Sequence, residues 1–262
     1  MYKADGNASS PFLGVLVHSA IMSVQDFTTG EIDFIVTSQA TNFTDPSTTL
    51  AVKTWYKIYG DLANRKHRPL VVLHGGPGVA HNYMLSLADL WTKYEIPVVF
   101  YDQIGAGMST HLPEKNGDVD FWSIRLFIAE LNNLLEHFKI DDDFDLLGNS
   151  WGAMLAAELA TTKPKGLKNL VFASGPASME LFMISLKEKL AGLPQEIQDT
   201  IKKHEDAGTT NDPEYQQAMM PFLFKHVCRL DPPPVEFMAC LHELEKDPTV
   251  YHTMCISFPL RK

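Results

Sequence analysis

The segment Gly148-Asn149-Ser150-Trp151-Gly152 constrains the fold of this chain more than any other part of its sequence. It has the form G-x-S-x-G and lies between a short apolar run at residues 144–147 and a helical pattern at residues 150–161. A serine at so tight a turn needs glycine two positions before and after it, because larger side chains would collide with neighbouring backbone. The helix that begins there directs N–H groups and a positive dipole toward the exposed serine oxygen. The pattern therefore predicts Ser150 as a nucleophile at the end of a strand.

Short apolar runs and helical patterns alternate around this segment, which predicts a mostly parallel sheet with helices on its faces. The apolar runs are residues 70–73, 98–101, 144–147 and 170–173, and the helical patterns are residues 121–138 and 150–161. Partial alternation of apolar and polar residues at 31–37 and 50–59 predicts an antiparallel hairpin at one edge. Ligands bind such sheets at the carboxyl ends of the strands, which is where Ser150 stands.

Two further motifs follow predicted strands. His74-Gly75-Gly76-Pro77-Gly78 comes directly after residues 70–73, and its glycines allow close approach of backbone to a substrate. We expect the backbone N–H groups of Gly76 and Trp151 to form an oxyanion hole. His74 is expected to be structural, because the base in hydrolases of this kind follows the nucleophile in the chain. Asp102, which ends the next strand, is expected to fix its loop by accepting backbone hydrogen bonds.

The three motifs HGGPG, D-Q-x-G-x-G-x-S (residues 102–109) and G-x-S-W-G together resemble the proline iminopeptidase family, and are similar to those of amino-acid amidases, over residues 24–254. The resemblance implies an α/β-hydrolase fold with a helical lid after the sixth strand. It also implies a serine exopeptidase that releases N-terminal residues, preferentially proline, from peptides or amides through an acyl-enzyme on Ser150. Family members often carry Arg, Cys and Arg where this chain has Ile104, Ala106 and Met108, and these differences affect the pocket.

The pattern changes after residue 176, and this change suggests the chain's organisation. We expect an N-terminal extension at residues 1–21, with Met1 or Met22 as the start, then an α/β core at 22–176, a helical lid at 177–254 and a divergent tail at 255–262. The expected lid helices are residues 180–190, 196–205, 213–228 and 234–244.

Substrate binding is the least constrained part of this sequence. The resemblance implies that acidic lid residues bind the substrate's ammonium group, and the segment at residues 212–216 resembles part of such a lid. Glu214 is the candidate there, and Gly75 is a candidate in the loop after the strand at 70–73. A solvated glutamate in the first turn of a helix accounts for Glu214 equally well.

An acid and a histidine should follow the lid, in the order Ser, Asp, His, but neither is present after a further strand. The match to the family stops at Met254, so we expect the final strands and helices of the fold to be absent, through a frameshift, a retained intron or a splice variant. Without a base, Ser150 is a poor nucleophile. The strand at residues 170–173 would form an exposed apolar edge open to aggregation or pairing. This 262-residue chain is therefore predicted to be inactive and poorly stable.

Composition limits the partners. With 22 Lys and Arg against 32 Asp and Glu, the net charge of −10 argues against nucleic-acid binding. No apolar stretch approaches the ~20 residues that span a bilayer, so no membrane association is expected. The three cysteines are odd in number and match no metal site, which indicates free thiols and a cytoplasmic rather than a secreted protein. No metal or organic cofactor is predicted.

Other functions remain open. An esterase of the same fold would share these motifs, whereas epoxide hydrolases of this fold usually have an acidic nucleophile, which Ser150 does not match. A non-catalytic protein that binds peptides in the pocket is the third alternative, and the absent base favours it. The small-molecule partner expected from the resemblance is a short peptide or an amino-acid amide.

Overall fold

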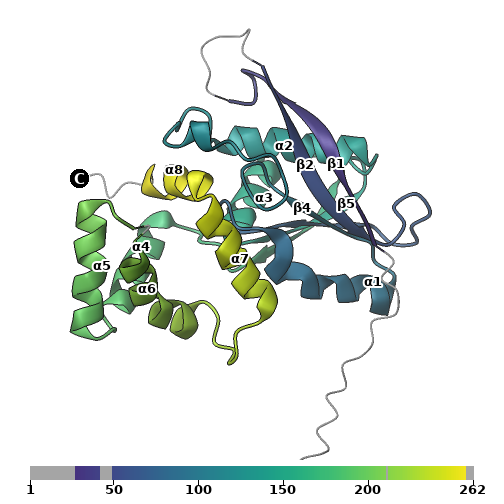
Figure 1. Cartoon of the computed structure of the whole chain (residues 1–262). Coiled ribbons are helices and arrows are strands. Elements are labelled where there is room, and N and C mark those ends of the chain that lie inside the picture. Colours follow the sequence, from purple (N-terminus) through teal and green to yellow (C-terminus); the bar gives the residue numbers. More distant parts are fainter. Residues whose placement is uncertain (1–26, 42–48, 211, 258–262) are drawn as a thin grey trace, which may run out of the picture.

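The computed structural model describes residues 27–41, 49–210 and 212–257, and in these residues six strands form one sheet (Figure 1). Their order across the sheet is β1-β2-β4-β3-β5-β6. The strands are β1 (Phe27–Val36), β2 (Leu50–Tyr59), β3 (Leu70–Leu73), β4 (Val98–Asp102), β5 (Phe144–Asn149) and β6 (Leu167–Ala173). All six predicted strands are confirmed, although β1 and β6 begin earlier than expected. The predicted extension at 1–21, both candidate start residues and residues 258–262 of the tail lie outside the described residues.

Pairing follows the predicted mixture of directions. β1 and β2 form the expected antiparallel hairpin at one edge, and β2 also pairs with β4 in the antiparallel sense. The strands β4, β3, β5 and β6 are parallel. β4 lies on one side of β3 and β5 lies on the other side. The loops after the neighbouring strands β3 and β5 therefore begin side by side but run in opposite directions across the sheet. This reversal is the position where open α/β sheets bind ligands.

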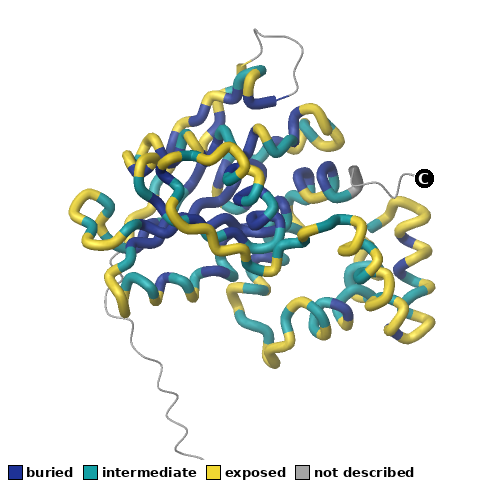
Figure 2. The backbone as a smooth tube through the Cα atoms, turned by 180° about the vertical axis from the view of Figure 1, so that it is seen from behind, coloured by how far each residue is buried: buried dark blue, intermediate teal, exposed yellow. Residues whose placement is uncertain are grey.

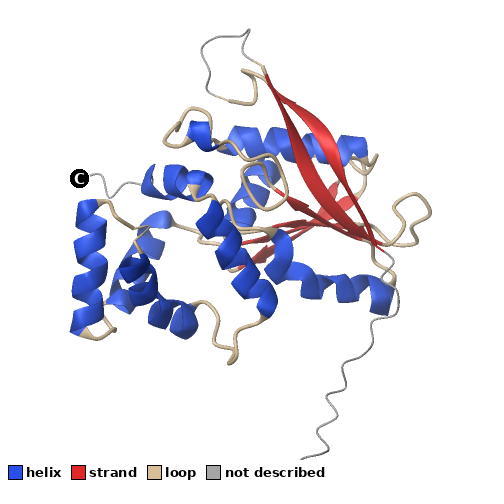
Figure 3. Cartoon of the chain, in the orientation of Figure 1, coloured by secondary structure: helices blue, strands red, loops and turns tan. Residues whose placement is uncertain are grey.

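The parallel strands β3 and β4 are buried on both faces, as their apolar runs predict. In β3, Val71 and Leu73 join one core, whereas Leu70 and Val72 join a second core on the opposite face. The first core includes apolar residues of α2 (Ile124–His137) and α3 (Trp151–Thr161). The second includes residues of the 3-10 helix η1 (His81–Ala88), and apolar side chains of α1 (Asp89–Tyr94) pack against it. Figure 3 shows helices on both sides of the sheet, and Figure 2 shows buried segments gathered inside the α/β part with exposed segments around them.

Three helical elements were not predicted from the sequence: η1, α1 and α8 (Thr249–Ser257), besides the single turn η2 (Pro113–Lys115). They are short, and helices of this length depend on tertiary packing more than on their own periodicity. In η1, Met84 and Ala88 are buried against the sheet, and in α8, Val250 is fully buried. Their positions are therefore set by contacts with distant parts of the chain.

The helices predicted after β6 are confirmed as α4 (Met179–Leu190), α5 (Gln195–Ala207), α6 (Pro213–His226) and α7 (Val235–Lys246). Figure 1 shows α5 and α6 at the end of the molecule opposite the β1–β2 hairpin. Leu193, Ile201 and Phe222 form a small core of their own, whereas α4 has no buried residue. Helix α7 packs against η1, so the helical region contacts the α/β part through that element.

Strand β6 is the second edge of the sheet, and its apolar residues are exposed. The exposed fractions are 37% for Leu170, 47% for Val171 and 43% for Phe172. Within the described ranges no strand pairs with the outer side of β6. The predicted exposed apolar edge is confirmed, and such an edge favours association with other chains.

Candidate active site

Ser150 lies in the strained turn that the G-x-S-x-G pattern predicts. Its φ of 54° and ψ of −116° lie outside the usual regions for a residue with a side chain, and it connects β5 directly to α3. A Cβ on Gly148 would lie 2.2 Å from the carbonyl oxygen of Gly152. A Cβ on Gly152 would lie 2.2 Å from the carbonyl oxygen of Leu73. The two glycines are therefore required by contacts between backbone segments, one within the turn and one with β3.

The loop after β3 lies against this turn. The sheet register places Leu73 beside Gly148, so the chain leaves both strands at the same level. A Cβ on Gly75 would lie 3.2 Å from the Cβ of Ser150. The structure therefore brings Gly75 next to the candidate nucleophile, as expected from its position after a neighbouring strand.

The candidate donors for an oxyanion are backbone N–H groups of the loop after β3 and of Trp151, the first residue of α3. The N–H of Gly75 donates to the Tyr83 hydroxyl at 2.8 Å, so it is not available to a substrate. The N–H groups of Gly76 and Trp151 donate to no acceptor in the described parts of the chain. Donors aimed at a common position are what an oxyanion hole requires. The assignment of the hole to Gly76 and Trp151, and of substrate contact to Gly75, stays a prediction.

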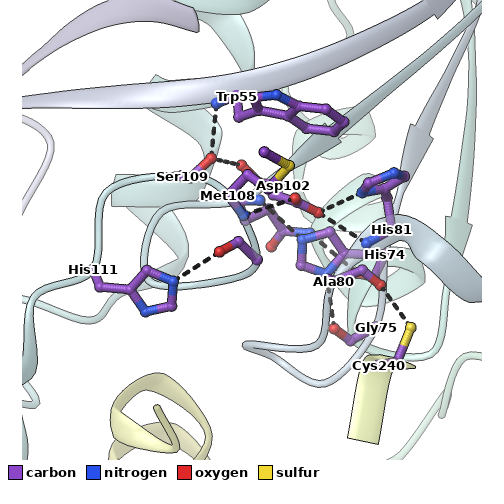
Figure 4. A network of polar contacts seen from close by, with 12 residues as sticks. Trp55, His74, Gly75, Ala80, His81, Asp102, Met108, Ser109, His111 and Cys240 are labelled. Atoms are coloured by element: carbon purple, nitrogen blue, oxygen red, sulfur yellow. Dashed lines mark hydrogen bonds and ion pairs between the residues drawn. The ribbon is translucent and has the colours of Figure 1, made fainter. Parts of the chain in front are cut away.

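Asp102 has the structural role that was expected, and Figure 4 shows its contacts. One carboxylate oxygen accepts from the backbone N–H of His81 at 2.9 Å, and the other accepts from that of Met108 at 3.0 Å. The His81 ring Nδ1 also lies 2.8 Å from the Asp102 carboxylate. Burial tends to raise the pKa of Asp102, but the His81 contact outweighs it and holds the pKa below its usual value. No sequence signal pointed to His81.

His74 is also structural, as predicted. It is fully buried, and its Nε2 accepts a hydrogen bond from the backbone N–H of Gln103 at 2.9 Å. Its Nδ1 lies 3.0 Å from the carbonyl oxygen of Gly75. Burial lowers the pKa of His74 to about 4, so the ring is neutral near neutral pH. The ring is neutral and both of its nitrogens have hydrogen-bond partners in the loops, so it is not available as a base for Ser150.

Glu130 is a buried acid that sequence reasoning missed. Its carboxylate accepts from the Thr54 hydroxyl at 2.6 Å and from the backbone N–H of Ile104 at 3.0 Å. Burial raises the pKa of Glu130 to about 8. The signal was present in the sequence, because Glu130 occupies the apolar stripe of α2 between Phe127 and Leu134. An acid in such a stripe is buried unless the helix rotates.

Helices α7 and α8 contact the loops that flank Ser150. Val250 of α8 lies close to Gly78 and Gly105, where an added Cβ would lie 3.2 Å and 2.3 Å from Val250 atoms, respectively. At the end of α7, Asp247 lies 2.6 Å from Nδ1 of His111, whose Nε2 lies 2.9 Å from the carbonyl oxygen of Gly107. Burial lowers the pKa of His111, but these two contacts outweigh it and raise the pKa above its usual value. His111 thus connects the helical region to the loop after β4 through these two polar contacts.

Glu214 begins α6 and already has partners. Its carboxylate lies 2.6 Å from the Lys203 ammonium and 3.0 Å from Nε2 of His204. The Lys203 contact lowers the pKa of Glu214. Its role in binding a substrate ammonium group stays a prediction. The substrate ammonium would have to replace the Lys203 ammonium as the partner of the Glu214 carboxylate. Ligand atoms of His204, Asp212 and Glu214 lie within 4.8 Å of one another, but the adjacent Lys203 charge disfavours a cation there.

The general base is not assigned. No histidine or carboxylate among residues 27–41, 49–210 and 212–257 forms a hydrogen bond with the Ser150 side chain. The three cysteines, Cys228, Cys240 and Cys255, are free thiols, as predicted. The described residues therefore contain a strained serine and two N–H groups without an acceptor. None of the described residues is assigned as the acceptor of the Ser150 hydroxyl proton.

Comparisons with known proteins give a consistent result. A family described as the alpha/beta hydrolase fold matches residues 68–212. The chain is 39% identical to a proline iminopeptidase of Clostridium botulinum over 178 residues, which covers 68% of this chain and 58% of that protein. It is 34% identical to a proline iminopeptidase of Thermoplasma volcanium over 200 residues, with 76% and 65% covered. The chain thus spans less than two thirds of the length of these curated relatives.

Two solved structures are similar as well. The crystal structure of VinJ aligns with a TM-score of 0.72 and 47% identity, over 76% of this chain and 66% of that one. The proline iminopeptidase of Mycobacterium smegmatis aligns with a TM-score of 0.66 and 40% identity, over 78% and 67%. These alignments confirm the predicted α/β arrangement and the predicted resemblance.

Proposed function

This chain belongs to the alpha/beta hydrolase fold family, and from that membership we propose that it is a serine hydrolase of the proline iminopeptidase type. The observation that supports this most directly is the position of Ser150, in a strained turn between β5 and α3 and beside Gly75 of the loop after β3. Its relatives named proline iminopeptidase favour short peptides or amides with an N-terminal proline as the substrate class.

In the proposed reaction, Ser150 Oγ adds to the carbonyl carbon of the N-terminal residue, and the hydroxyl proton passes to solvent. The carbonyl oxygen becomes an anion and accepts hydrogen bonds from the N–H groups of Gly76 and Trp151. Collapse of the tetrahedral species breaks the C–N bond, and the departing amine takes up a proton. Water then hydrolyses the resulting ester, which releases the N-terminal residue and restores the Ser150 hydroxyl. Glu214 is our candidate for binding the substrate ammonium.

The rate of this reaction depends on a base for the Ser150 proton. Since no described histidine contacts that side chain, we expect the 262-residue chain to retain only the residual catalysis that binding and an oxyanion hole provide. In serine proteases without their triad this residual is about 10³–10⁴-fold over the uncatalysed reaction.

The expected partners and location follow from the charge and the substrate class. We propose a small peptide or amide substrate, no nucleic-acid partner, no membrane association and a cytoplasmic location. The net charge of −10 supports the absence of a nucleic-acid partner. No helix in the described part of the chain is long and apolar enough to cross a membrane.

Hydrolysis of L-proline p-nitroanilide and of p-nitrophenyl acetate by the purified chain tests the proposal, with Ser150→Ala as the control. We expect release of nitroaniline no faster than this residual catalysis, and the same in the Ser150→Ala variant. Faster release that Ser150→Ala abolishes would support Ser150 as the nucleophile and contradict the predicted inactivity. Hydrolysis of the ester alone would favour the esterase alternative. The missing contact to Ser150 favours a second candidate, a peptide-binding protein without catalysis. Saturable binding of a proline amide, with no turnover that depends on Ser150, would support that candidate.

A further inference from the structure

The two halves of the proposed oxyanion hole come from separate parts of the chain. Gly76 lies in the loop after β3, and Trp151 begins α3 after β5. Donors of an oxyanion hole must lie about 2.7–3.1 Å from the same oxygen. Catalytic groups of this kind must be held within about 0.5 Å of that geometry by neighbouring residues. A loop rich in glycine does not provide this precision by itself.

Tyr83 forms one cross-link between the two segments. It lies on η1, and its hydroxyl accepts from the Gly75 N–H at 2.8 Å and donates to Oδ1 of Asn149 at 2.7 Å. Both partners immediately precede residues of the site, Gly76 and Ser150. Because the hydroxyl both accepts and donates, it fixes the distance between the two segments. It also occupies the Gly75 N–H, which leaves Gly76 as the donor for substrate.

Gln103 forms a second cross-link between the same segments. Its side chain is fully buried in the loop after β4. Its Nε2 donates to the carbonyl oxygen of His74 at 3.1 Å, and its Oε1 accepts from the indole N–H of Trp151 at 2.9 Å. The backbone N–H of Gln103 also donates to His74 Nε2 at 2.9 Å. The Gln103 amide therefore bonds at one end to the segment that contains Gly76 and at the other end to the side chain of Trp151.

We propose that Tyr83 and Gln103 are positioning residues that hold the Gly76 and Trp151 N–H groups at the separation needed to bind one oxyanion. This inference rests on the proposed function. The two side chains come from different elements, η1 and the loop after β4, and bridge the same pair of segments. Loss of either cross-link frees one half of the hole to move relative to the other, even where the fold is retained.

The test uses pyrrolidin-2-ylboronic acid, the boronic acid analogue of proline. Its boron accepts the Ser150 oxygen and forms a tetrahedral anion, while the serine proton passes to solvent. Titration followed by ¹H–¹⁵N NMR reports affinity and the shifts of the Gly76 and Trp151 amide signals. The variants are Tyr83→Phe, Gln103→Leu and Gln103→Glu, the last as a near-isosteric replacement where leucine disrupts folding.

Matched controls make the same changes elsewhere. Tyr94→Phe removes a hydroxyl from an exposed side chain, and Gln198→Leu removes an amide that donates to the carbonyl oxygens of Ala191 and Leu193. The first control lies on α1 and the second on α5. Thermal unfolding of every variant separates lost positioning from lost folding.

In the wild type we expect both amide signals to move together with one dissociation constant. Tyr83→Phe and Gln103→Leu should each weaken binding about 10- to 100-fold and uncouple the two signals, because small displacements of catalytic groups have effects of this size. The two changes combined should weaken binding by less than the product of their separate effects, since they loosen the same gap. The controls should change affinity less than about twofold.

Gln103→Glu provides an internal rescue. Ionised, the glutamate cannot donate to the His74 carbonyl, so binding relative to wild type should weaken as the pH rises through the titration of this buried carboxyl. Protonated at pH 5, it regains the donor, and the ratio to wild type should recover.

Two patterns of failure are distinct. If the wild type binds the boronic acid but folded Tyr83→Phe and Gln103 variants bind it equally well with coupled signals, the positioning role is wrong and the proposed function stands. If the boronic acid moves neither amide signal in the wild type, the proposed function is wrong, and the positioning role fails with it.

Discussion

Replacing Glu130 with glutamine should remove a large part of the pH dependence of unfolding. Glu130 is fully buried, and burial raises its pKa from 4.5 to about 8. In the unfolded chain the carboxyl releases its proton near pH 4.5, whereas in the folded protein it retains the proton up to about pH 8. Rising pH therefore favours the unfolded chain across this window, so the stability that the protonated form contributes is present at acid pH and is lost as the pH rises.

The size of the effect follows from the two pKa values. Each unit of pH between them changes the free energy of unfolding by about 1.4 kcal/mol. Across the window the total is on the order of 5 kcal/mol, which is comparable with the whole stability of many domains. Glutamine preserves the acceptor for Ile104 N–H and a partner for the Thr54 hydroxyl, but it does not titrate.

The assay is urea unfolding followed by far-UV circular dichroism at pH 5, 6, 7 and 8 and constant ionic strength. The Glu130→Gln variant should gain stability relative to wild type by about 1.4 kcal/mol for each unit of pH in the window. The matched control is Glu158→Gln, on the exposed side of α3, whose curve should run parallel to that of the wild type. A constant difference between Glu130→Gln and wild type at all four values would refute the reasoning.

Three other predictions concern the turn, the helical region and the sheet edge. Gly152→Ala places a Cβ 2.2 Å from the Leu73 carbonyl oxygen, so it should lower stability by several kcal/mol, about 3 or more, in the same urea assay. His111→Gln should lower the unfolding temperature more at pH 5 than at pH 8. The raised pKa of His111 beside Asp247 means that its stabilising contribution is present below the unfolded-state pKa and is lost as the pH rises through the folded-state value; equal losses at both pH values would contradict this. Val171→Lys, at the centre of exposed β6, should reduce concentration-dependent association in light scattering, and unchanged association would show that another surface is responsible.

The candidate site depends on four chain segments that meet at one end of the sheet. The loop after β3 supplies Gly76, the turn after β5 supplies Ser150 and Trp151, and the loop after β4 supplies Gln103. Helix η1, which follows the loop after β3, supplies Tyr83. Since each cross-link joins different segments, stability of the site is a property of their packing and not of one motif.

Local physics made much of this protein predictable from its sequence. Apolar runs of four residues are typical of strands in a covered parallel sheet, and they predicted β3, β4, β5 and β6 closely. The alternating segments predicted the hairpin of β1 and β2. The need for glycine at positions 148 and 152 was predicted from the tightness of the turn. The nearest atoms that a side chain would meet lie in the turn itself or in the adjacent strand β3. Asp102 and His74 were correctly expected to be structural.

Only the tertiary structure revealed which residues hold the site together. Tyr83 reaches Asn149 across 66 positions of sequence, Gln103 reaches Trp151 across 48, and Thr54 reaches Glu130 across 76. Periodicity and motifs describe neighbours along the chain, whereas these contacts depend on the order of strands across the sheet. The short helices η1 and α8 were missed for the same reason, since their stability comes from the surfaces on which they pack. The sequence thus determined the candidate nucleophile and its scaffold, and the fold decided its supporting contacts, because those depend on distances between segments that no local pattern encodes.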